Sequence, residues 1–118
     1  MNKKDFRILF MGTPEFAVES LNAIVNNGFN VVAVVTMPDK EQGRGMKMTP
    51  SAVKSYATDH GIEVLQPEKL KDESFVDKLR SLNIDLAVVV AFRMLPEIVW
   101  QMPKYGTINL HGSLLPKY

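Results

Sequence analysis

A chain of 118 residues, 46% of them hydrophobic and 23% charged, has the size and composition of one globular domain with a substantial core. Its net charge of +1 gives no global indication of nucleic-acid binding, so any such contact has to come from a local basic patch. The absence of cysteine excludes disulfides, a thiolate nucleophile and a zinc–thiolate site, and it fits the reducing environment of the cytoplasm. The apolar run over residues 8–11 is too short for a secretion signal or a membrane span.

Strands and helices are predicted to alternate from the start of the chain. A buried strand is expected over residues 7–11, and Thr13 is expected to cap the next helix with Pro14 as its first residue. Gly28 should end that helix, and a Val-rich strand follows over residues 30–36.

A polar loop without regular structure is expected over residues 37–50, and loops of this length often have a function. Ser51 should then begin a helix that Gly61 ends. A short strand over residues 63–65 and an amphipathic helix around residues 75–82 complete the middle of the chain.

The last third contains an apolar strand over residues 86–91, a short helix over 96–101 and a final strand over 107–110. Because continuous apolar strands alternate with helices, we expect a mostly parallel sheet with helices on both faces, a Rossmann-like α/β fold. The turn at residues 12–14 lacks the G-x-G-x-x-G pattern of dinucleotide-binding folds, which argues against a nucleotide cofactor.

The clearest chemical pattern is an amide and an imidazole close together near residue 110. In an extended run, Asn109, His111 and Ser113 can face the same side. An amide can donate to a developing oxyanion and an imidazole can move a proton, as acyl transfer requires. Since neither residue is a nucleophile, direct transfer between two bound substrates fits better than a covalent intermediate. From spacing alone, a structural role for His111 is equally favoured.

Two other segments each allow two interpretations. Arg44 lies between two glycines, where it can meet phosphate, but a solvated loop explains the pattern equally well. Residues 92–96 follow a buried strand, so their apolar side chains either line a pocket for a flat ring or pack against a neighbouring helix.

Residues 109–116, Asn-Leu-His-Gly-Ser-Leu-Leu-Pro, match the Asn-x-His-x-Ser-Leu-Leu-Pro signature of folate-dependent formyltransferases. Residues 10–17 resemble the opening of the methionyl-tRNA formyltransferases, and residues 37–54 resemble their tRNA-contacting loop. The resemblance spans the chain. It implies that residues 1–118 are the N-terminal part of the formyltransferase catalytic domain, with an incomplete formyltransferase fold.

The resemblance also implies roles for individual residues. Asn109 and His111 correspond to catalytic residues that polarise the formyl carbonyl and stabilise the tetrahedral intermediate. The implied folate-binding residues are Ser113, Leu114, Leu115, Pro116, Phe92 and Met94, and the implied tRNA-binding residues are Arg44 and Lys47. Arg93 and Met94 depart from the family pattern, because many members have glycine near this strand end.

The implied reaction moves a formyl group from 10-formyltetrahydrofolate to the α-amino group of methionine on initiator methionyl-tRNA. We expect a cytoplasmic monomer that needs no metal and has no membrane partner. The family's third catalytic residue, an aspartate, and its C-terminal tRNA-binding domain are expected beyond Tyr118, so we expect residues 1–118 alone to be inactive. Two alternatives stay open: a formyltransferase for sugar-nucleotide amines, which shares the signature, and a non-catalytic α/β module that binds folate or a nucleotide.

Overall fold

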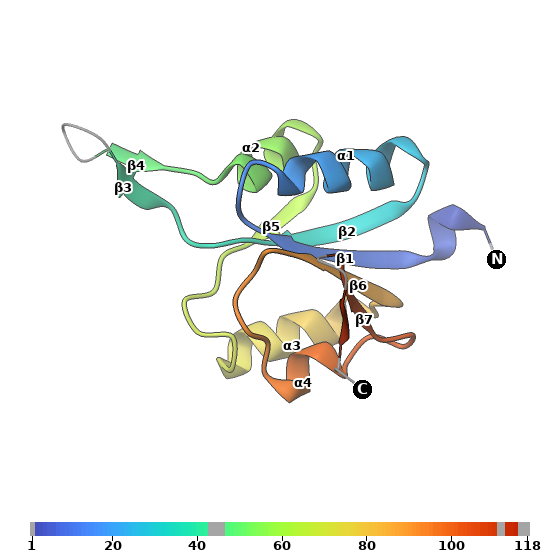
Figure 1. The fold of residues 1–118 in the computed structure, drawn as a ribbon. Coiled ribbons are helices and arrows are strands. Elements are labelled where there is room, and N and C mark those ends of the chain that lie inside the picture. The colour runs from blue at the N-terminus through green and yellow to red at the C-terminus, as the bar shows by residue number, and fades with distance from the viewer. Residues whose placement is uncertain (1, 43–46, 111–112, 116–118) are drawn as a thin grey trace.

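The computed structural model describes residues 2–42, 47–110 and 113–115, which form an α/β fold (Figure 1). Within these residues, the main sheet has six strands in the order β5-β2-β1-β6-β7-β8. Its strands are β1 (Arg7–Gly12), β2 (Asn30–Val35), β5 (Glu63–Leu65), β6 (Leu86–Val90), β7 (Thr107–Asn109) and β8 (Ser113–Leu115). The helices are η1 (Lys3–Asp5), α1 (Ala17–Asn26), α2 (Ala52–Asp59), α3 (Glu73–Ser81) and α4 (Glu97–Trp100).

The predicted parallel α/β architecture is confirmed, with one addition at the edge of the sheet. Strands β5, β2, β1, β6 and β7 are parallel, whereas β8 pairs antiparallel with β7. The expected extended run from Asn109 to Ser113 is therefore wrong. The strand ends at Asn109, and the chain comes back so that Asn109 and Ser113 are register partners.

Successive side chains of β1 enter two different cores, because neighbouring strand residues point to opposite faces of a sheet. Leu9 and Met11 pack with residues of α3 and α4, and Ile8 and Phe10 pack with residues of α1 and α2. None of these four side chains is more than 3% exposed. Helices therefore cover both faces of the sheet, as the sequence predicts (Figure 1).

The two long helices of one face begin differently from each other. Ser51 caps α2 as predicted, since its Oγ accepts a hydrogen bond from the backbone nitrogen of Lys54 at 3.0 Å. The predicted cap of the first helix is wrong. Helix α1 begins at Ala17 rather than Pro14, and the hydroxyl of Thr13 instead accepts a hydrogen bond from the backbone nitrogen of Met37 at 3.2 Å.

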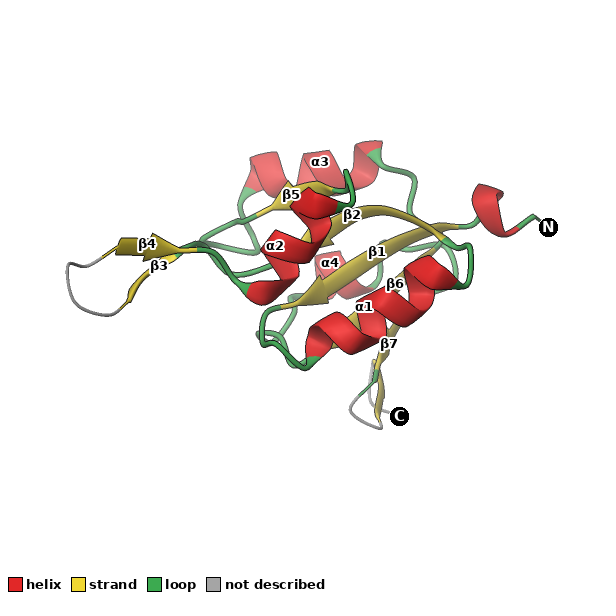
Figure 2. Cartoon of the chain, turned by 90° about the horizontal axis from the view of Figure 1, so that it is seen from above, coloured by secondary structure: helices red, strands yellow, loops and turns green. Residues whose placement is uncertain are grey.

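The segment over residues 37–50, for which the sequence predicts no regular structure, contains a β-hairpin. Strands β3 (Lys40–Gln42) and β4 (Lys47–Thr49) pair antiparallel, with Lys40 opposite Thr49. The hairpin projects from the body of the domain in both ribbon views (Figures 1 and 2). Lys40, Lys47 and Met48 are exposed, so this part of the hairpin shows no alternation of buried and exposed residues that the sequence could reveal.

Candidate functional site

The order of the strands reverses between β1 and β6, which lie side by side in the centre of the sheet. From β1 the chain proceeds towards β2 and β5, whereas from β6 it proceeds towards β7 on the other side. Open α/β sheets bind ligands beyond the carboxyl ends of their strands at such a point. The ends of β1 and β6 lie close together here because residue 12 is a glycine. A Cβ atom at this position would lie 2.9 Å from the carbonyl oxygen of Val90.

The backbone leaves β6 in an unusual conformation. Ala91 has a φ of 48°, in the left-handed region that residues with a Cβ atom rarely adopt. Such strain persists only where the surrounding structure imposes it, and it is concentrated at binding and catalytic sites. Ala91 thus marks the carboxyl end of β6 as a candidate site and sets the direction of residues 92–96.

The guanidinium of Arg93 joins this loop to the connection between β5 and α3. Its Nη2 and Nη1 atoms donate to the carbonyl oxygens of Pro67 and Glu68 at 2.8 and 2.9 Å, and its Cζ lies 5.0 Å from the ring centroid of Phe92. Burial lowers the pKa of Arg93, and among the described atoms its buried Nε has no hydrogen-bond partner. An arginine side chain stays charged in this setting, so the loop carries a fixed positive charge.

A cavity of about 540 Å³ lies beside this loop. Its lining residues are Lys69, Leu70, Lys71, Arg93, Met94, Leu95 and Pro96. Leu70 and Leu95 are buried at its apolar floor, whereas the side chain of Met94 is 93% exposed. An apolar floor with three cationic residues around it suits a flat ring that carries carboxylates.

A second group of polar side chains lies at the carboxyl ends of β1 and β2. The hydroxyl of Thr36, which is fully buried, lies 2.7 Å from the hydroxyl of Ser51 and donates to that of Thr13 at 3.4 Å. These contacts tie the first turn, the end of β2 and the start of α2 together. A smaller cavity of about 280 Å³ adjoins them, lined by residues 13–15, Met37, Pro38, Lys40 and residues 49–52.

The base of the hairpin carries an ion pair that no sequence motif marks. The Nζ atom of Lys54 lies 2.9 and 3.1 Å from the two carboxylate oxygens of Asp39. The side-chain amide of Gln66 donates to Asp39 at 2.7 Å and to the carbonyl oxygen of Met37 at 3.1 Å. Hydrogen bonds from Gln66 and Lys54 lower the pKa of the Asp39 carboxyl below its ordinary value.

The site residues predicted from the sequence fall into separate groups. Asn109 is half-buried at the end of β7, in register with Val89 of β6. Phe92 and Met94 lie together in the loop after β6, and Lys47 is exposed on β4, in the projecting hairpin. Ser113, Leu114 and Leu115 form β8, whereas Arg44, His111 and Pro116 lie outside the described residues.

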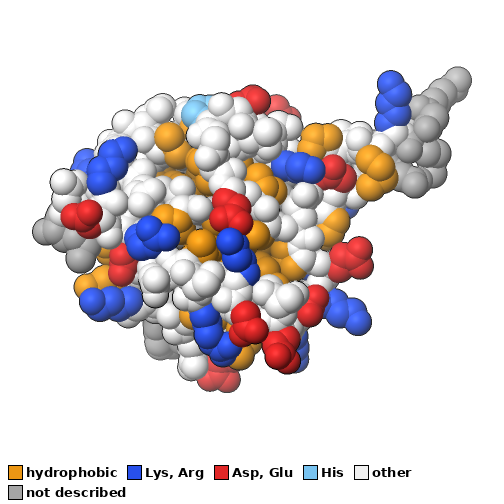
Figure 3. All heavy atoms as spheres, turned by 180° about the vertical axis from the view of Figure 1, so that it is seen from behind, with side chains coloured by type: hydrophobic (Ala, Val, Ile, Leu, Met, Phe, Trp, Pro, Cys, Tyr) orange, Lys and Arg blue, Asp and Glu red, His pale blue; other side chains and the backbone are white. Residues whose placement is uncertain are grey.

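On the face shown in Figure 3, basic and acidic side chains are interspersed, in keeping with the net charge of +1. In the described part of the chain, no helix is long and apolar enough to cross a membrane. Among residues 2–42, 47–110 and 113–115, no group of three or more histidine, aspartate or glutamate side chains is arranged to hold a metal ion.

A doubly wound α/β sheet with cavities beyond the carboxyl ends of its strands has the architecture of proteins that bind ligands at that edge. Residues 6–118 match the family model described as "Formyl transferase". The chain belongs to this family, which confirms the resemblance seen in the sequence.

The relatives named methionyl-tRNA formyltransferase are similar over all or nearly all of the chain. The protein of Parabacteroides distasonis is 65% identical over all of this chain and 37% of its own length. That of Bacteroides fragilis is 62% identical over all of this chain and 36% of its own length. That of Flavobacterium johnsoniae is 58% identical over 95% of this chain and 36% of its own length. The chain thus spans little more than a third of the relatives it matches.

Proposed function

We propose that this chain is the N-terminal part of a monomeric enzyme that transfers a formyl group from 10-formyltetrahydrofolate to the α-amino group of methionine on initiator methionyl-tRNA. The observation that carries the proposal is the junction of β6 and β7. There, in a member of the formyl transferase family, the loop that follows β6 lines a cavity with a basic rim, and the strand paired with β6 ends in Asn109.

The chemistry is a direct acyl transfer. The amine nitrogen attacks the formyl carbon, the bond from that carbon to N10 of the folate breaks, and N10 takes up a proton as tetrahydrofolate leaves. We assign Asn109 as the hydrogen-bond donor to the formyl oxygen, which becomes negative in the tetrahedral intermediate. His111 is assigned to stabilise that intermediate and to move the proton released by the attacking amine. No residue of the chain needs to be acylated.

The cavity after β6 is the proposed site of the formyl donor. Its buried leucines and the exposed Met94 suit an aromatic ring system, and its three cationic residues suit the carboxylates at the glutamate end of a folate. Phe92 and the segment from Ser113 to Pro116 belong to the same proposed site.

The projecting hairpin is the proposed site for tRNA. Lys40 and Lys47 are exposed on its two strands, and Arg44 lies between them in the sequence. Cationic side chains on an arm that stands away from the domain can reach the phosphates of a large substrate, whereas the formyl donor stays at the edge of the sheet.

The test uses a fusion protein in which residues 1–118 precede the part of the Parabacteroides distasonis relative that lies downstream of the matched segment. We expect it to produce formyl-methionyl-tRNA from 10-formyltetrahydrofolate, and we expect residues 1–118 alone to do so far more slowly. Formylation of a sugar-nucleotide amine but not of methionyl-tRNA would overturn the proposed acceptor. Folate binding by the fusion protein without any formyl transfer would favour the non-catalytic module.

A further inference from the structure

We propose that Asp39 is a positioning residue that fixes the direction of the β3–β4 hairpin and thereby sets how tightly the tRNA acceptor is held. This inference rests on the proposed function, because it concerns the same substrate. Asp39 lies immediately before β3. It is assigned no contact with either substrate.

The hairpin needs such a device because it stands away from the core. Its two strands pair with each other, and both views show them extending beyond the sheet and helices (Figures 1 and 2). Its direction is therefore set mainly by the two arms that connect it to the domain. The outgoing arm covers residues 36–39, and the returning arm enters α2 through Pro50 and Ser51.

Two contacts hold the outgoing arm at different points along its length, one to the returning arm and the other to α2. The inner one is the contact of 2.7 Å between the hydroxyls of Thr36 and Ser51. The outer one is the ion pair between Asp39 and Lys54, at 2.9 Å. A single contact would leave the hairpin free to pivot about that point, whereas two contacts at separate points fix the direction of the hairpin. Loss of Asp39 should therefore release the hairpin without detaching it.

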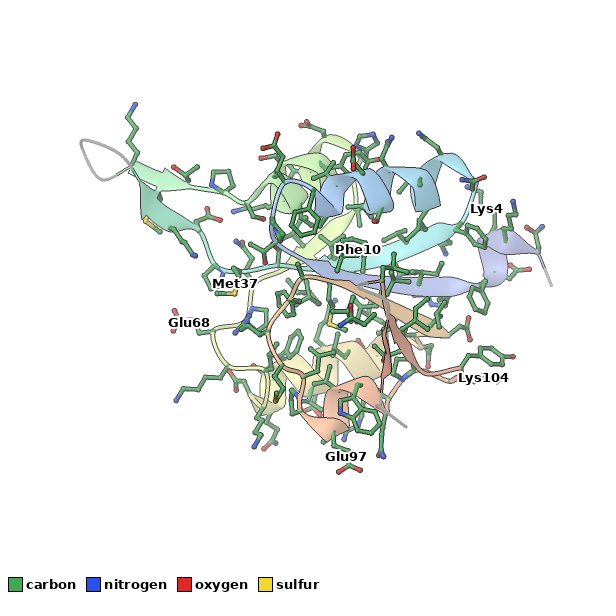
Figure 4. All side chains as sticks on the ribbon, viewed as in Figure 1. Lys4, Phe10, Met37, Glu68, Glu97 and Lys104 are labelled. Carbon is green, nitrogen blue, oxygen red and sulfur yellow. The ribbon has the colours of Figure 1, made fainter. Side chains whose placement is uncertain are left out.

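Gln66 ties the same carboxylate to the main sheet. It follows β5 and donates both to Asp39 and to the carbonyl oxygen of Met37, so the outgoing arm is held by the segment after β5 as well as by α2. The adjoining residue Pro67 and its neighbour Glu68 accept hydrogen bonds from Arg93. Figure 4 shows Met37 and Glu68 at the same end of the sheet. One short segment thus holds both the hairpin arm and the loop beside the larger cavity.

The charge of Asp39 fits a positioning role better than a contact with substrate. A free carboxylate beside Lys40 would repel the phosphates of tRNA. Both oxygens of Asp39 are already engaged, one by Lys54 and the other by Lys54 and Gln66. The carboxylate of Asp39 is thereby neutralised within the domain, and it does not offset the exposed Lys40 and Lys47 of the hairpin.

The competing explanation is an ordinary surface ion pair with little effect on anything. The chain offers a matched control in the ion pair between Glu63 and Lys78, also at 2.9 Å. It likewise joins a residue at a strand to one on a helix, and its side chains are 43% and 40% exposed, compared with 25% and 29% for Asp39 and Lys54. The control pair has no connection to the hairpin.

The kinetic test compares Asp39→Asn, Lys54→Met, Lys54→Arg and Glu63→Gln in the fusion protein. We expect Asp39→Asn and Lys54→Met to raise the KM for methionyl-tRNA about tenfold, with the KM for 10-formyltetrahydrofolate unchanged. Lys54→Arg, which keeps the ion pair, should restore most of the affinity, and Glu63→Gln should change neither constant. An equal rise in both KM values, or an effect of Glu63→Gln as large as that of Asp39→Asn, would overturn the inference.

A measurement of geometry separates this inference from the proposed function. Because the chain has no cysteine, spin labels can be attached at Met48→Cys on the hairpin and Asp59→Cys on α2, with cysteines of the added segment replaced by serine. The distance distribution between the labels should broaden in Asp39→Asn and stay narrow in Glu63→Gln. An unchanged distribution in Asp39→Asn contradicts the inference whatever the substrate. A fusion protein that does not formylate methionyl-tRNA contradicts the proposed function, and the label distances then decide the positioning role of Asp39.

Discussion

Asn109, the last residue of β7, is in register with Val89 of β6. Two residues after Val89, Ala91 has a positive φ of 48°. Two neighbouring parallel strands thus end together, one in the amide proposed for catalysis and the other in the loop beside the larger cavity. We therefore propose that a formyl donor held beside the loop after β6 presents its formyl carbon towards the end of β7, where Asn109 lies. This arrangement is the reason for expecting a rigid site at the edge of the sheet.

Replacement of Asn109 by alanine in the fusion protein should lower kcat for methionyl-tRNA formylation by about 100-fold or more, because an oxyanion donor acts mainly in the transition state. The KM values for both substrates should change little. Steady-state kinetics with each substrate varied in turn measures both effects. Asn26→Ala, an exposed change on α1, serves as the control. An unchanged kcat in Asn109→Ala would remove this residue from the mechanism.

The basic residues of the hairpin should affect the tRNA alone. Replacing Arg44 or Lys47 by alanine is expected to raise the KM for methionyl-tRNA. A plot of the logarithm of this KM against the logarithm of the salt concentration should have a slope that is smaller by about one for each phosphate that the variant no longer binds. The KM for the formyl donor should not change. The exposed Lys104, whose Nζ lies over the ring of Tyr105, provides the control as Lys104→Ala. Equal increases in KM for both substrates would contradict the assignment.

The five parallel strands and most of the helix ends are readable in the sequence, because each depends on local chemistry. Ser51 caps α2 through its own backbone neighbourhood, and Gly28, with a φ of 85°, ends α1 as predicted. Thr13 fails as a predicted cap because its hydroxyl accepts a hydrogen bond from Met37, a contact that depends on the packing of β1 against β2. Strand β8 is not predicted from the sequence, because it pairs with β7 only after the chain reverses direction.

The candidate site is predictable only where a motif marks it. In the sequence, Asp39 is merely a charge that offsets its basic neighbours, because its partners Lys54 and Gln66 lie 15 and 27 residues away. Nothing local to Ala91 indicates a positive φ, since alanine carries no preference for that region. Arg93 stands out only as a departure from the family pattern, and its bonds to two carbonyl groups become visible in the fold.

Backbone strain at Ala91 can be measured as stability. Ala91→Gly should raise the free energy of unfolding of residues 1–118 by up to about 1 kcal/mol, because glycine adopts a positive φ without a steric cost. Ala91→Val should lower it by about 2 kcal/mol, since a β-branched residue is least compatible with this region. Urea denaturation measures both values. Asn83→Gly is the matched control, because Asn83 has a φ of 50° but asparagine tolerates it.

The ion pair of Asp39 should appear in the pH dependence of stability. Folding lowers the pKa of this carboxyl, so its contribution is complete above the ordinary pKa of an aspartate and is lost as the pH falls through the folded pKa. Residues 1–118 should therefore be more stable than the Asp39→Asn variant at about pH 6, and the difference should shrink below about pH 4. Urea denaturation at a series of pH values measures it. A difference that is constant from about pH 6 to about pH 3 would contradict the assignment.

Arg93 should govern the formyl donor rather than the tRNA. Arg93→Lys keeps a positive charge, but an ammonium group lacks the planar fork that donates to the carbonyl oxygens of Pro67 and Glu68 together. We expect the KM for 10-formyltetrahydrofolate to rise about tenfold, because the loop beside the cavity loses its attachment. The KM for methionyl-tRNA should stay the same. Arg80→Lys, which alters an arginine paired with Asp77 at 3.1 Å on α3, controls for the change in side-chain type. If Arg80→Lys shifts the donor KM as far as Arg93→Lys does, the larger cavity is not the donor site.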